Sequence, residues 1–227
     1  MSTLPDALNT PATASAPRLV VMDVDSTLIT AEVIELLAAR SGSLAAVADI
    51  TDRAMRGEID FAASLHQRVA TLAGLSTTVF GEVLAEVELT PGAVELVAEL
   101  DARGWPLALV SGGFVEVVEP LAASLGITRF RANGLEARDG VLTGRVRGPV
   151  IDRAAKALAL REFAAESGIP LERTIAIGDG ANDLDMLEQA GFGVAFNAKP
   201  LVCGQADAVV RGRLDDVLGL APFALAG

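Results

Sequence analysis

The chain has 227 residues, a formal net charge of −12 and a hydrophobic content of 51%. That length is sufficient for one core, or for a core with a smaller inserted unit, and the hydrophobic content argues against disorder over most of the chain. The acidic balance, without any basic stripe, argues against a nucleic-acid partner, and no apolar stretch approaches the ~20 residues of a membrane span.

The first residues and the single cysteine bear on the compartment. Residues 1–17 are rich in Ala, Thr, Ser and Pro and predict a flexible tail, without the basic and apolar regions of a secretory signal. Cys203 is the only cysteine, so an internal disulfide is impossible, as is typical of a reducing cytoplasm. We expect a cytoplasmic protein that is a monomer or a homodimer.

The expected secondary structure changes character near residue 90. A short apolar strand is predicted at 19–22, and four helix-like segments follow with no strand between them, at 32–40, 44–56, 61–72 and 78–88. Helix and strand then alternate: helix 91–103 with Thr90 as its cap, strand 106–110, helix 114–125, hairpin 134–146 with its turn at 139–140, helix 152–167, strand 174–177, helix 183–190, strands 192–196 and 208–210, and a last short helix.

This alternation predicts an α/β fold, with a Rossmann-like parallel sheet as the core and helices on both of its faces. The core is expected to comprise residues 18–30 and 90–221. The inserted all-helical stretch 31–89 is predicted to be an α-helical cap domain that excludes water from a site and selects its ligand. Ligands in such sheets bind beyond the carboxyl ends of the strands, so residues that follow strands directly are expected to meet.

Two predicted strands end in pairs of carboxylates. Asp23 and Asp25 follow the strand at 19–22, where alternation along an extended chain predicts that both side chains point the same way. Asp179 and Asp183 follow the strand at 174–177. Like charges at this spacing destabilise each other unless a cation or a reaction uses them. The pattern therefore predicts a Mg²⁺ site for phosphoryl chemistry.

Four segments in order resemble the motifs of the haloacid dehalogenase-like hydrolases and, within that superfamily, of the phosphoserine phosphatases. They are residues 23–27, residues 111–113, Lys156 and residues 178–183. The resemblance covers residues 18–220. It implies a Mg²⁺-dependent phosphomonoesterase that hydrolyses O-phospho-L-serine through an aspartyl-phosphate intermediate, in serine biosynthesis.

The resemblance also implies a role for each residue that matches a motif. The implied catalytic residues are Asp23 as nucleophile, Asp25 as general acid and then base, and Lys156 to offset charge on the phosphate. The implied metal site comprises Asp23, the backbone carbonyl of Asp25 and Asp179, with Asp183 holding the metal's waters. The implied substrate contacts are Ser111, Gly112, Gly113 and Asn182 at the phosphate, Glu32 at the ammonium and Arg68 at the carboxylate.

Other interpretations stay open. Asn182 also fits a helix cap, and Glu32 and Arg68, considered without the resemblance, are ordinary surface charges. The same chemistry could act on phosphohomoserine, a sugar phosphate or phosphoglycolate. An amino-acid substrate needs both Glu32 and Arg68, whereas a simple phosphorylated acid needs no partner for an ammonium group. A non-catalytic phosphate-binding module is a third alternative, which the presence of all the implied catalytic residues disfavours.

Overall fold

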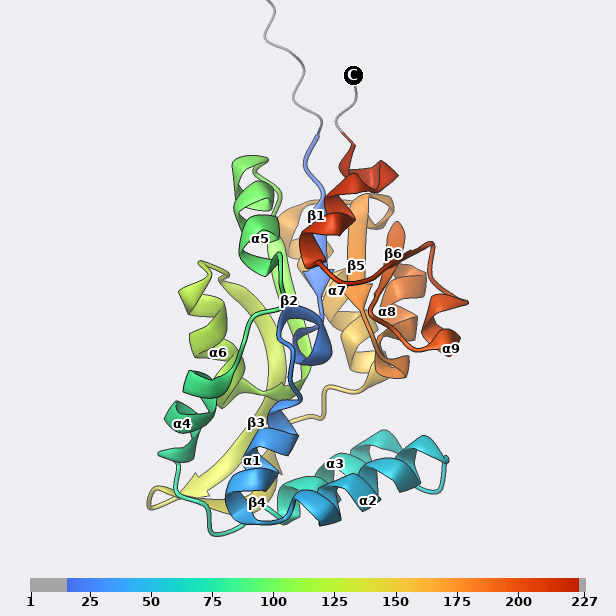
Figure 1. Ribbon diagram of the computed structural model, residues 1–227. Coiled ribbons are helices and arrows are strands. Elements are labelled where there is room, and N and C mark those ends of the chain that lie inside the picture. Colours follow the sequence, from blue (N-terminus) through green and yellow to red (C-terminus); the bar gives the residue numbers. More distant parts are fainter. Residues whose placement is uncertain (1–15, 225–227) are drawn as a thin grey trace, which may run out of the picture.

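The computed structural model of the protein describes residues 16–224 (Figure 1). The flexible tail was predicted for residues 1–17, and residues 1–15 of it lie outside the described residues. One seven-stranded sheet has the order β4-β3-β2-β1-β5-β6-β7, and neighbouring strands are parallel except for β3 and β4. The strands are β1 (Leu19–Met22), β2 (Leu107–Phe114), β3 (Arg129–Arg138), β4 (Val141–Arg147), β5 (Thr174–Gly178), β6 (Phe192–Phe196) and β7 (Ala208–Val210).

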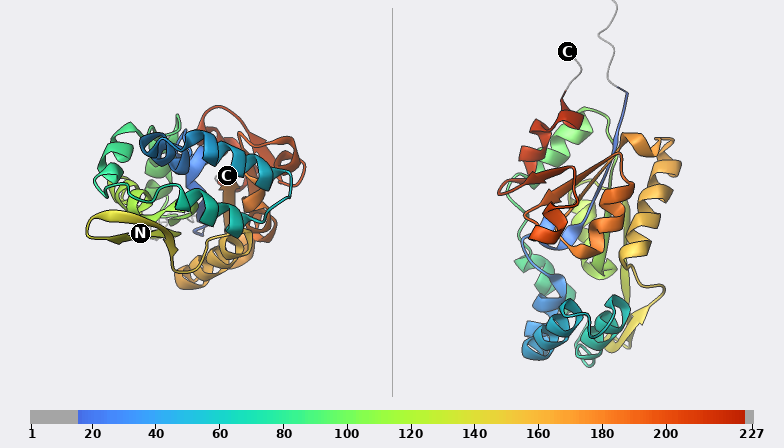
Figure 2. Two further views of the ribbon diagram at one scale, coloured as in Figure 1. Left: turned by 90° about the horizontal axis from the view of Figure 1, so that it is seen from below. Right: turned by 90° about the vertical axis from the view of Figure 1, so that its right-hand side faces the viewer.

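Helices cover both faces of this sheet (Figures 1 and 2). The helices α5 (Ala93–Ala102) and α6 (Val115–Ser124) pack on one face, and α7 (Arg153–Ser167) and α8 (Leu184–Gln189) pack on the other. Side chains of β1 alternate between the two layers: Val20 and Met22 belong to the first core and Leu19 and Val21 to the second. The predicted α/β fold with a Rossmann-like sheet is confirmed.

The inserted helices lie at the carboxyl ends of the parallel strands (Figure 1). They are α1 (Val33–Ser41), α2 (Leu44–Met55), α3 (Phe61–Ala70) and α4 (Val79–Glu86). The chain enters and leaves this stretch side by side, because Ile29 and Leu89 form an isolated antiparallel bridge. The division of the chain into a core and a cap domain stays a prediction.

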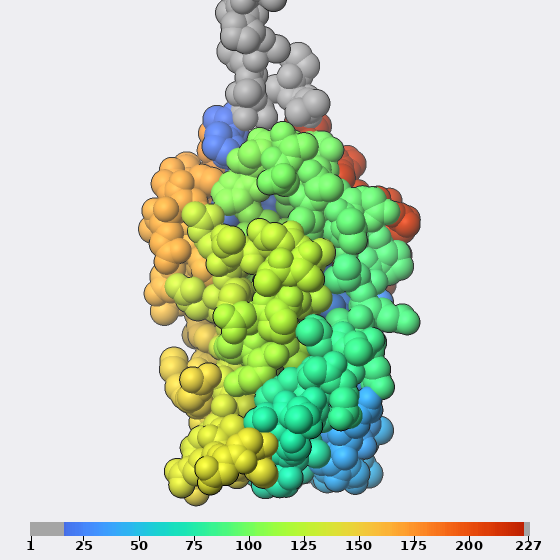
Figure 3. Space-filling view, turned by 90° about the vertical axis from the view of Figure 1, so that its left-hand side faces the viewer, coloured from blue at the N-terminus to red at the C-terminus, as the bar shows by residue number. Residues whose placement is uncertain are grey.

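The hairpin of β3 and β4 forms a second attachment between the inserted helices and the sheet. The backbone N–H of Gly74 donates to the carbonyl of Leu142 over 2.9 Å, and Leu142 donates in return to Leu75 over 2.8 Å. Figure 3 shows the hairpin, in yellow, beside this segment after α3, in teal. The end of α3 is therefore tied to the sheet independently of the covalent linkers.

Among the predicted boundaries that the structure changes, two depend on contacts with distant parts of the chain. Gly92, with a φ of 87°, precedes α5 in place of the predicted cap Thr90, and a Cβ atom there would lie 2.0 Å from Asp215 Oδ1. β3 begins at Arg129, five residues before the predicted hairpin, because its first half pairs with β2. The turn predicted at Asp139 and Gly140 is confirmed, with a positive φ at both residues.

Within residues 16–224, no helix is both long enough and apolar enough to cross a membrane.

Candidate active site

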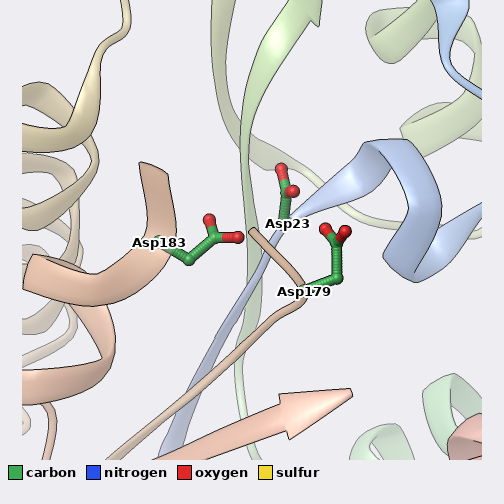
Figure 4. A group of neighbouring side chains, drawn as sticks. All are labelled: Asp23, Asp179 and Asp183. Carbon is green, nitrogen blue, oxygen red and sulfur yellow. The ribbon is translucent and has the colours of Figure 1, made fainter. Parts of the chain in front are cut away.

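Three carboxylates meet where β1 and β5 end. These strands are parallel neighbours, with Met22 opposite Ile177, so the residues that follow them are brought together. Asp23, Asp179 and Asp183 each place one oxygen within 4.8 Å of the others, and Figure 4 shows the three side chains converging. Asp23 and Asp183 are buried and Asp179 is partly buried. The sequence prediction that the two acidic strand ends meet is confirmed.

Lys156 supplies the positive charge behind this carboxylate cluster. Its Nζ donates to Asp23 Oδ1 and to Asp183 Oδ1, both over 2.7 Å, and its side chain is completely buried. Burial lowers the pKa of Lys156, but the nearby Asp183 and Asp23 carboxylates outweigh burial and hold that pKa above its ordinary value. The lysine therefore stays charged and offsets part of the negative charge.

The cluster remains short of positive charge. Burial and the neighbouring Asp183 raise the pKa of Asp23 well above its ordinary value, against the opposing effect of Lys156. The same two causes raise the pKa of Asp179 to about 6. Converging carboxylate oxygens whose ionised form is disfavoured fit a hard divalent cation, because such a cation would restore the missing charge. The donor set at this position therefore fits Mg²⁺.

Glycines allow the carboxylates to approach one another. A Cβ atom at Gly178, the last residue of β5, would lie 2.5 Å from Asp183 Cγ. The backbone N–H of Gly180 donates to Asp183 Oδ2 over 3.0 Å and fixes that carboxylate. Asn182 lies within the short turn Ala181–Asp183, which is preceded by Gly180 as its cap, so Asn182 is not the helix cap that the sequence left open.

Asp25 lies at the same site, but a turn and not an extended strand places it there. β1 ends at Met22, and Asp25 lies in the turn Val24–Leu28, in which Ser26 has a φ of 56°. The interpretation that strand alternation aligns Asp25 with Asp23 is therefore wrong. Asp25 Oδ1 instead accepts from the N–H of Val33, the first residue of α1, over 3.1 Å.

The environment of Asp25 suits proton transfer. Burial, and then the nearby Glu32, raise the pKa of Asp25 to about 7, although the N–H of Val33 and the Ser111 hydroxyl favour the charged form. A carboxyl group with this pKa can both release and accept a proton near neutral pH.

The segment 111–113 is held at the end of β2. The strand predicted at 106–110 is longer in the structure and includes this segment, because β2 continues to Phe114 and α6 begins at Val115. The N–H of Gly113 donates to Ser111 Oγ over 2.8 Å, and that hydroxyl lies 3.4 Å from Asp25 Oδ2. A Cβ atom at Gly113 would lie 2.5 Å from Asp25 Oδ2, so any other residue there would displace the Asp25 carboxylate.

Asn133 is a residue of this site that sequence reasoning missed. It is completely buried, its Nδ2 donates to the carbonyl of Gly112 over 2.8 Å, and its Oδ1 accepts from the N–H of Ile151 over 2.8 Å. Asn133 thus ties the end of β2 to the segment before α7, the helix that carries Lys156. No local pattern marks it, since its position depends on the pairing of β3 with β2.

A cavity of about 680 Å³ lies between the carboxylate cluster and the inserted helices. Of the predicted site residues, the cavity is lined by Asp23, Asp25, Glu32, Arg68, Gly112, Gly113, Asp179 and Asn182, whereas Ser111, Lys156 and Asp183 lie behind its wall.

Glu32 accepts a hydrogen bond from the Ser26 hydroxyl over 2.6 Å. Burial lowers the pKa of Arg68, and the nearby Glu32 partly offsets this effect. No ion pair within 4.0 Å joins the described side chains of Glu32 and Arg68.

The fold and the site together define a class: an α/β protein in which a cluster of carboxylates that fits a divalent cation lies at the carboxyl ends of the strands, next to a set of inserted helices. The family described as haloacid dehalogenase-like hydrolase matches residues 20–188, and the chain belongs to this family.

Similar proteins point to one group within the family. A phosphoserine phosphatase of Mycobacterium tuberculosis is 55% identical over 204 residues, which are 89% of this chain and 50% of that protein, so the chain spans about half of its length. A phosphoserine phosphatase of Streptococcus thermophilus is 53% identical over 83% of this chain and 87% of its own. A solved phospho-aspartyl intermediate analogue of phosphoserine phosphatase is 39% identical, with a TM-score of 0.84 over 89% of this chain and 98% of its own.

Proposed function

We propose that the protein hydrolyses O-phospho-L-serine to L-serine and phosphate, with Mg²⁺ and through an aspartyl-phosphate formed on Asp23. The observation that carries the proposal is that one cavity combines a carboxylate cluster backed by Lys156 with Glu32 and Arg68, a separate acid and base. The similarity to phosphoserine phosphatases supports the same substrate. Since Cys203 is the only cysteine, the cytoplasm suits this enzyme.

Asp23 is the proposed nucleophile. Its Oδ1 is held by Lys156, which leaves Oδ2 to attack the phosphorus atom while the bond between phosphorus and the serine oxygen breaks. Ser111, Gly112 and Gly113 are proposed to bind the phosphate oxygens, together with Asn182. Binding through the Ser111 hydroxyl and the N–H of Gly113 would require both groups to exchange their present contact with each other for a contact with the phosphate. Lys156 then offsets negative charge on the aspartyl-phosphate, as it offsets that of the free carboxylate.

Asp25 is the proposed proton carrier. Its protonated carboxyl group gives a proton to the departing serine oxygen, and the resulting carboxylate accepts a proton from the water that hydrolyses the aspartyl-phosphate. The water's oxygen ends in the released phosphate, and Asp23 regains its free carboxylate. A pKa of about 7 suits both transfers.

Mg²⁺ would be held by Asp23 and Asp179 with the backbone carbonyl of Asp25, and Asp183 would orient its waters. The ion would supply charge that screens the phosphate from the attacking carboxylate. Lys156 remains the cation that fixes Asp23 and Asp183 in place.

The substrate is selected on the side of the inserted helices. Glu32 is proposed to bind the ammonium group and Arg68 the carboxylate, because a guanidinium group suits a carboxylate's two oxygens. Phosphohomoserine would also use both residues, whereas phosphoglycolate would leave Glu32 without a partner.

The direct experiment is to measure phosphate release from phosphoserine, phosphohomoserine, phosphoglycolate and an aryl phosphate, each with Mg²⁺ and with a chelator. The proposal expects metal-dependent release that strongly favours phosphoserine. Metal-dependent release that favours another ester would keep Asp23 and Asp25 in their roles but remove Glu32 and Arg68 from theirs.

Arg68→Ala is expected to reduce kcat/KM for phosphoserine by about 100-fold, because the substrate carboxylate would lose its charged partner. An aryl phosphate, which lacks that carboxylate, is expected to lose far less. Arg53→Ala in α2 is the matched control, since Arg53 does not line the cavity. Equal losses of Arg68→Ala on both substrates would show that Arg68 supports the helices rather than the substrate.

Mg²⁺ is expected to stabilise the folded protein even without substrate. At about ten times its dissociation constant it should raise the Tm of chelator-treated protein by roughly 3–6 °C. Asp179→Asn should abolish this shift because it removes a ligand, whereas Asp49→Asn, an exposed residue of α2, should keep it. A wild-type protein whose Tm does not respond to Mg²⁺ would contradict the metal site.

A further inference from the structure

Lys199 follows β6 and lines the cavity from the side of the sheet. Of the 18 lysines and arginines in the sequence, only Lys156 and Lys199 are lysines. Lys156 is buried behind Asp23, whereas Lys199 is exposed and lines the cavity. The described site therefore contains both lysines of the chain, and the reaction proposed above uses only one of them.

The backbone that carries Lys199 is fixed. Asn197, which follows β6, has a φ of 45°, and its Oδ1 accepts from the N–H of Gly212 over 2.9 Å. The carbonyl of Lys199 itself accepts from the N–H groups of Val202 and Cys203, both over 3.0 Å. The backbone position of Lys199 is thus fixed by hydrogen bonds to the chain on both sides of it.

The side chain of Lys199 reaches from the sheet toward the inserted helices. Its Nζ lies 3.9 Å from the Sδ of Met55, the last residue of α2. The Met55 side chain also lines the cavity and is 63% exposed, so this contact marks the outer end of the cavity. The buried carboxylate cluster marks the inner end, where the phosphate is expected.

The charges around the cavity leave Lys199 without a partner. Five acidic residues line the cavity with two basic ones: the acidic ones are Asp23, Asp25, Glu32, Glu35 and Asp179, and the basic ones are Arg68 and Lys199. Among residues 16–224, no carboxylate oxygen lies within 4.0 Å of Lys199 Nζ or of the Arg68 guanidinium group. Two cations without a carboxylate partner among the described residues, in an otherwise acidic cavity, are positioned to receive an anionic group.

We infer that Lys199 and Arg68, which line the same cavity, together bind the carboxylate of a phosphorylated amino acid. The inference rests on the proposed function, and it adds a second carboxylate-binding residue, from the sheet side, to the one from α3. The substrate would thereby connect the inserted helices to the sheet. Among the described residues, Lys199 Nζ contacts Met55 and forms no ion pair with a carboxylate of the cluster, so Lys199 acts on substrate capture and not on the chemical step.

The test is a comparison of Lys199→Gln, Lys199→Arg and a charge-matched control, Arg138→Gln, which removes an exposed cation on the hairpin away from the cavity. Lys199→Gln should raise KM for phosphoserine about fivefold, as expected for one partly solvated ion pair, with little change in kcat. Lys199→Arg should restore most of the loss. With phosphoethanolamine, which has the ammonium group but no carboxylate, Lys199→Gln should behave as the wild type.

A second measurement detects occupancy without turnover. Acetylation of Lys199 by an amine-reactive reagent, measured by mass spectrometry in an Asp23→Asn background with Mg²⁺, should slow when phosphoserine is added and not when phosphoethanolamine is added. An unchanged KM in Lys199→Gln, an equal loss with both esters, or acetylation that phosphoserine does not slow would overturn the inference. Failure of the wild type to hydrolyse phosphoserine would instead refute the proposed function.

Discussion

Replacement of Asp23 by Asn is expected to reduce phosphate release by roughly 1,000-fold or more, because an amide cannot form the aspartyl-phosphate. The fold should survive. The raised pKa of Asp23 means that its ionised form is less favourable in the folded chain than in the unfolded one, so its charge lowers stability above the unfolded pKa. The neutral and nearly isosteric Asn removes that penalty, and Lys156 keeps Asp183 as a partner.

Two measurements check this prediction. Phosphate release from phosphoserine is compared between the wild type, Asp23→Asn and the control Asp49→Asn, and urea unfolding of the metal-free proteins gives their free energies of unfolding. We expect Asp23→Asn to be at least as stable as the wild type. Wild-type rates in Asp23→Asn would remove Asp23 as the nucleophile, and an unfolded variant would show that the contact with Lys156 dominates stability.

The sequence predicted those parts of the site whose position depends only on a strand and on the loop that follows it. Asp23 and Asp179 each follow an apolar strand, and the rule that ligands bind beyond parallel strand ends brings them together without any knowledge of the contacts. The alternation of strands and helices likewise predicted a sheet covered on both faces. The period-2 argument for Asp25 failed, because the chain leaves the extended conformation at Val24.

The parts that the sequence did not reveal depend on pairing between distant segments. Asn133 reaches Gly112 only because the first half of β3 pairs with β2, and the arginines at 129 and 131 obscure that strand in the sequence. Gly92 replaces the expected cap of α5 because Asp215, far along the chain, lies too close for a Cβ atom. Lys199 lines the cavity because β6 ends beside the cavity, and no local motif at Lys199 indicates this position.

The buried Lys156 provides the largest expected effect on stability. Lys156→Met keeps a side chain of similar length but leaves Asp23 and Asp183 without their cation, and both carboxylates are buried. Removal of one partner of a buried ion pair costs about 3–5 kcal/mol, so metal-free Lys156→Met should lose that much free energy of unfolding at neutral pH. The chain's other lysine supplies the control, because exposed Lys199→Met should change the free energy of unfolding by less than about 0.5 kcal/mol.

The origin of this loss can be separated from a loss of packing. If uncompensated charge causes it, Asp183→Asn added to Lys156→Met should recover much of the stability, since one buried carboxylate is then neutral. Saturating Mg²⁺ should also recover part of the loss, because the ion brings positive charge to the same carboxylates. A double variant as unstable as Lys156→Met, without any response to Mg²⁺, would mean that Lys156 stabilises the core by packing alone. In that case the charge of Lys156 would matter for the reaction and not for the fold.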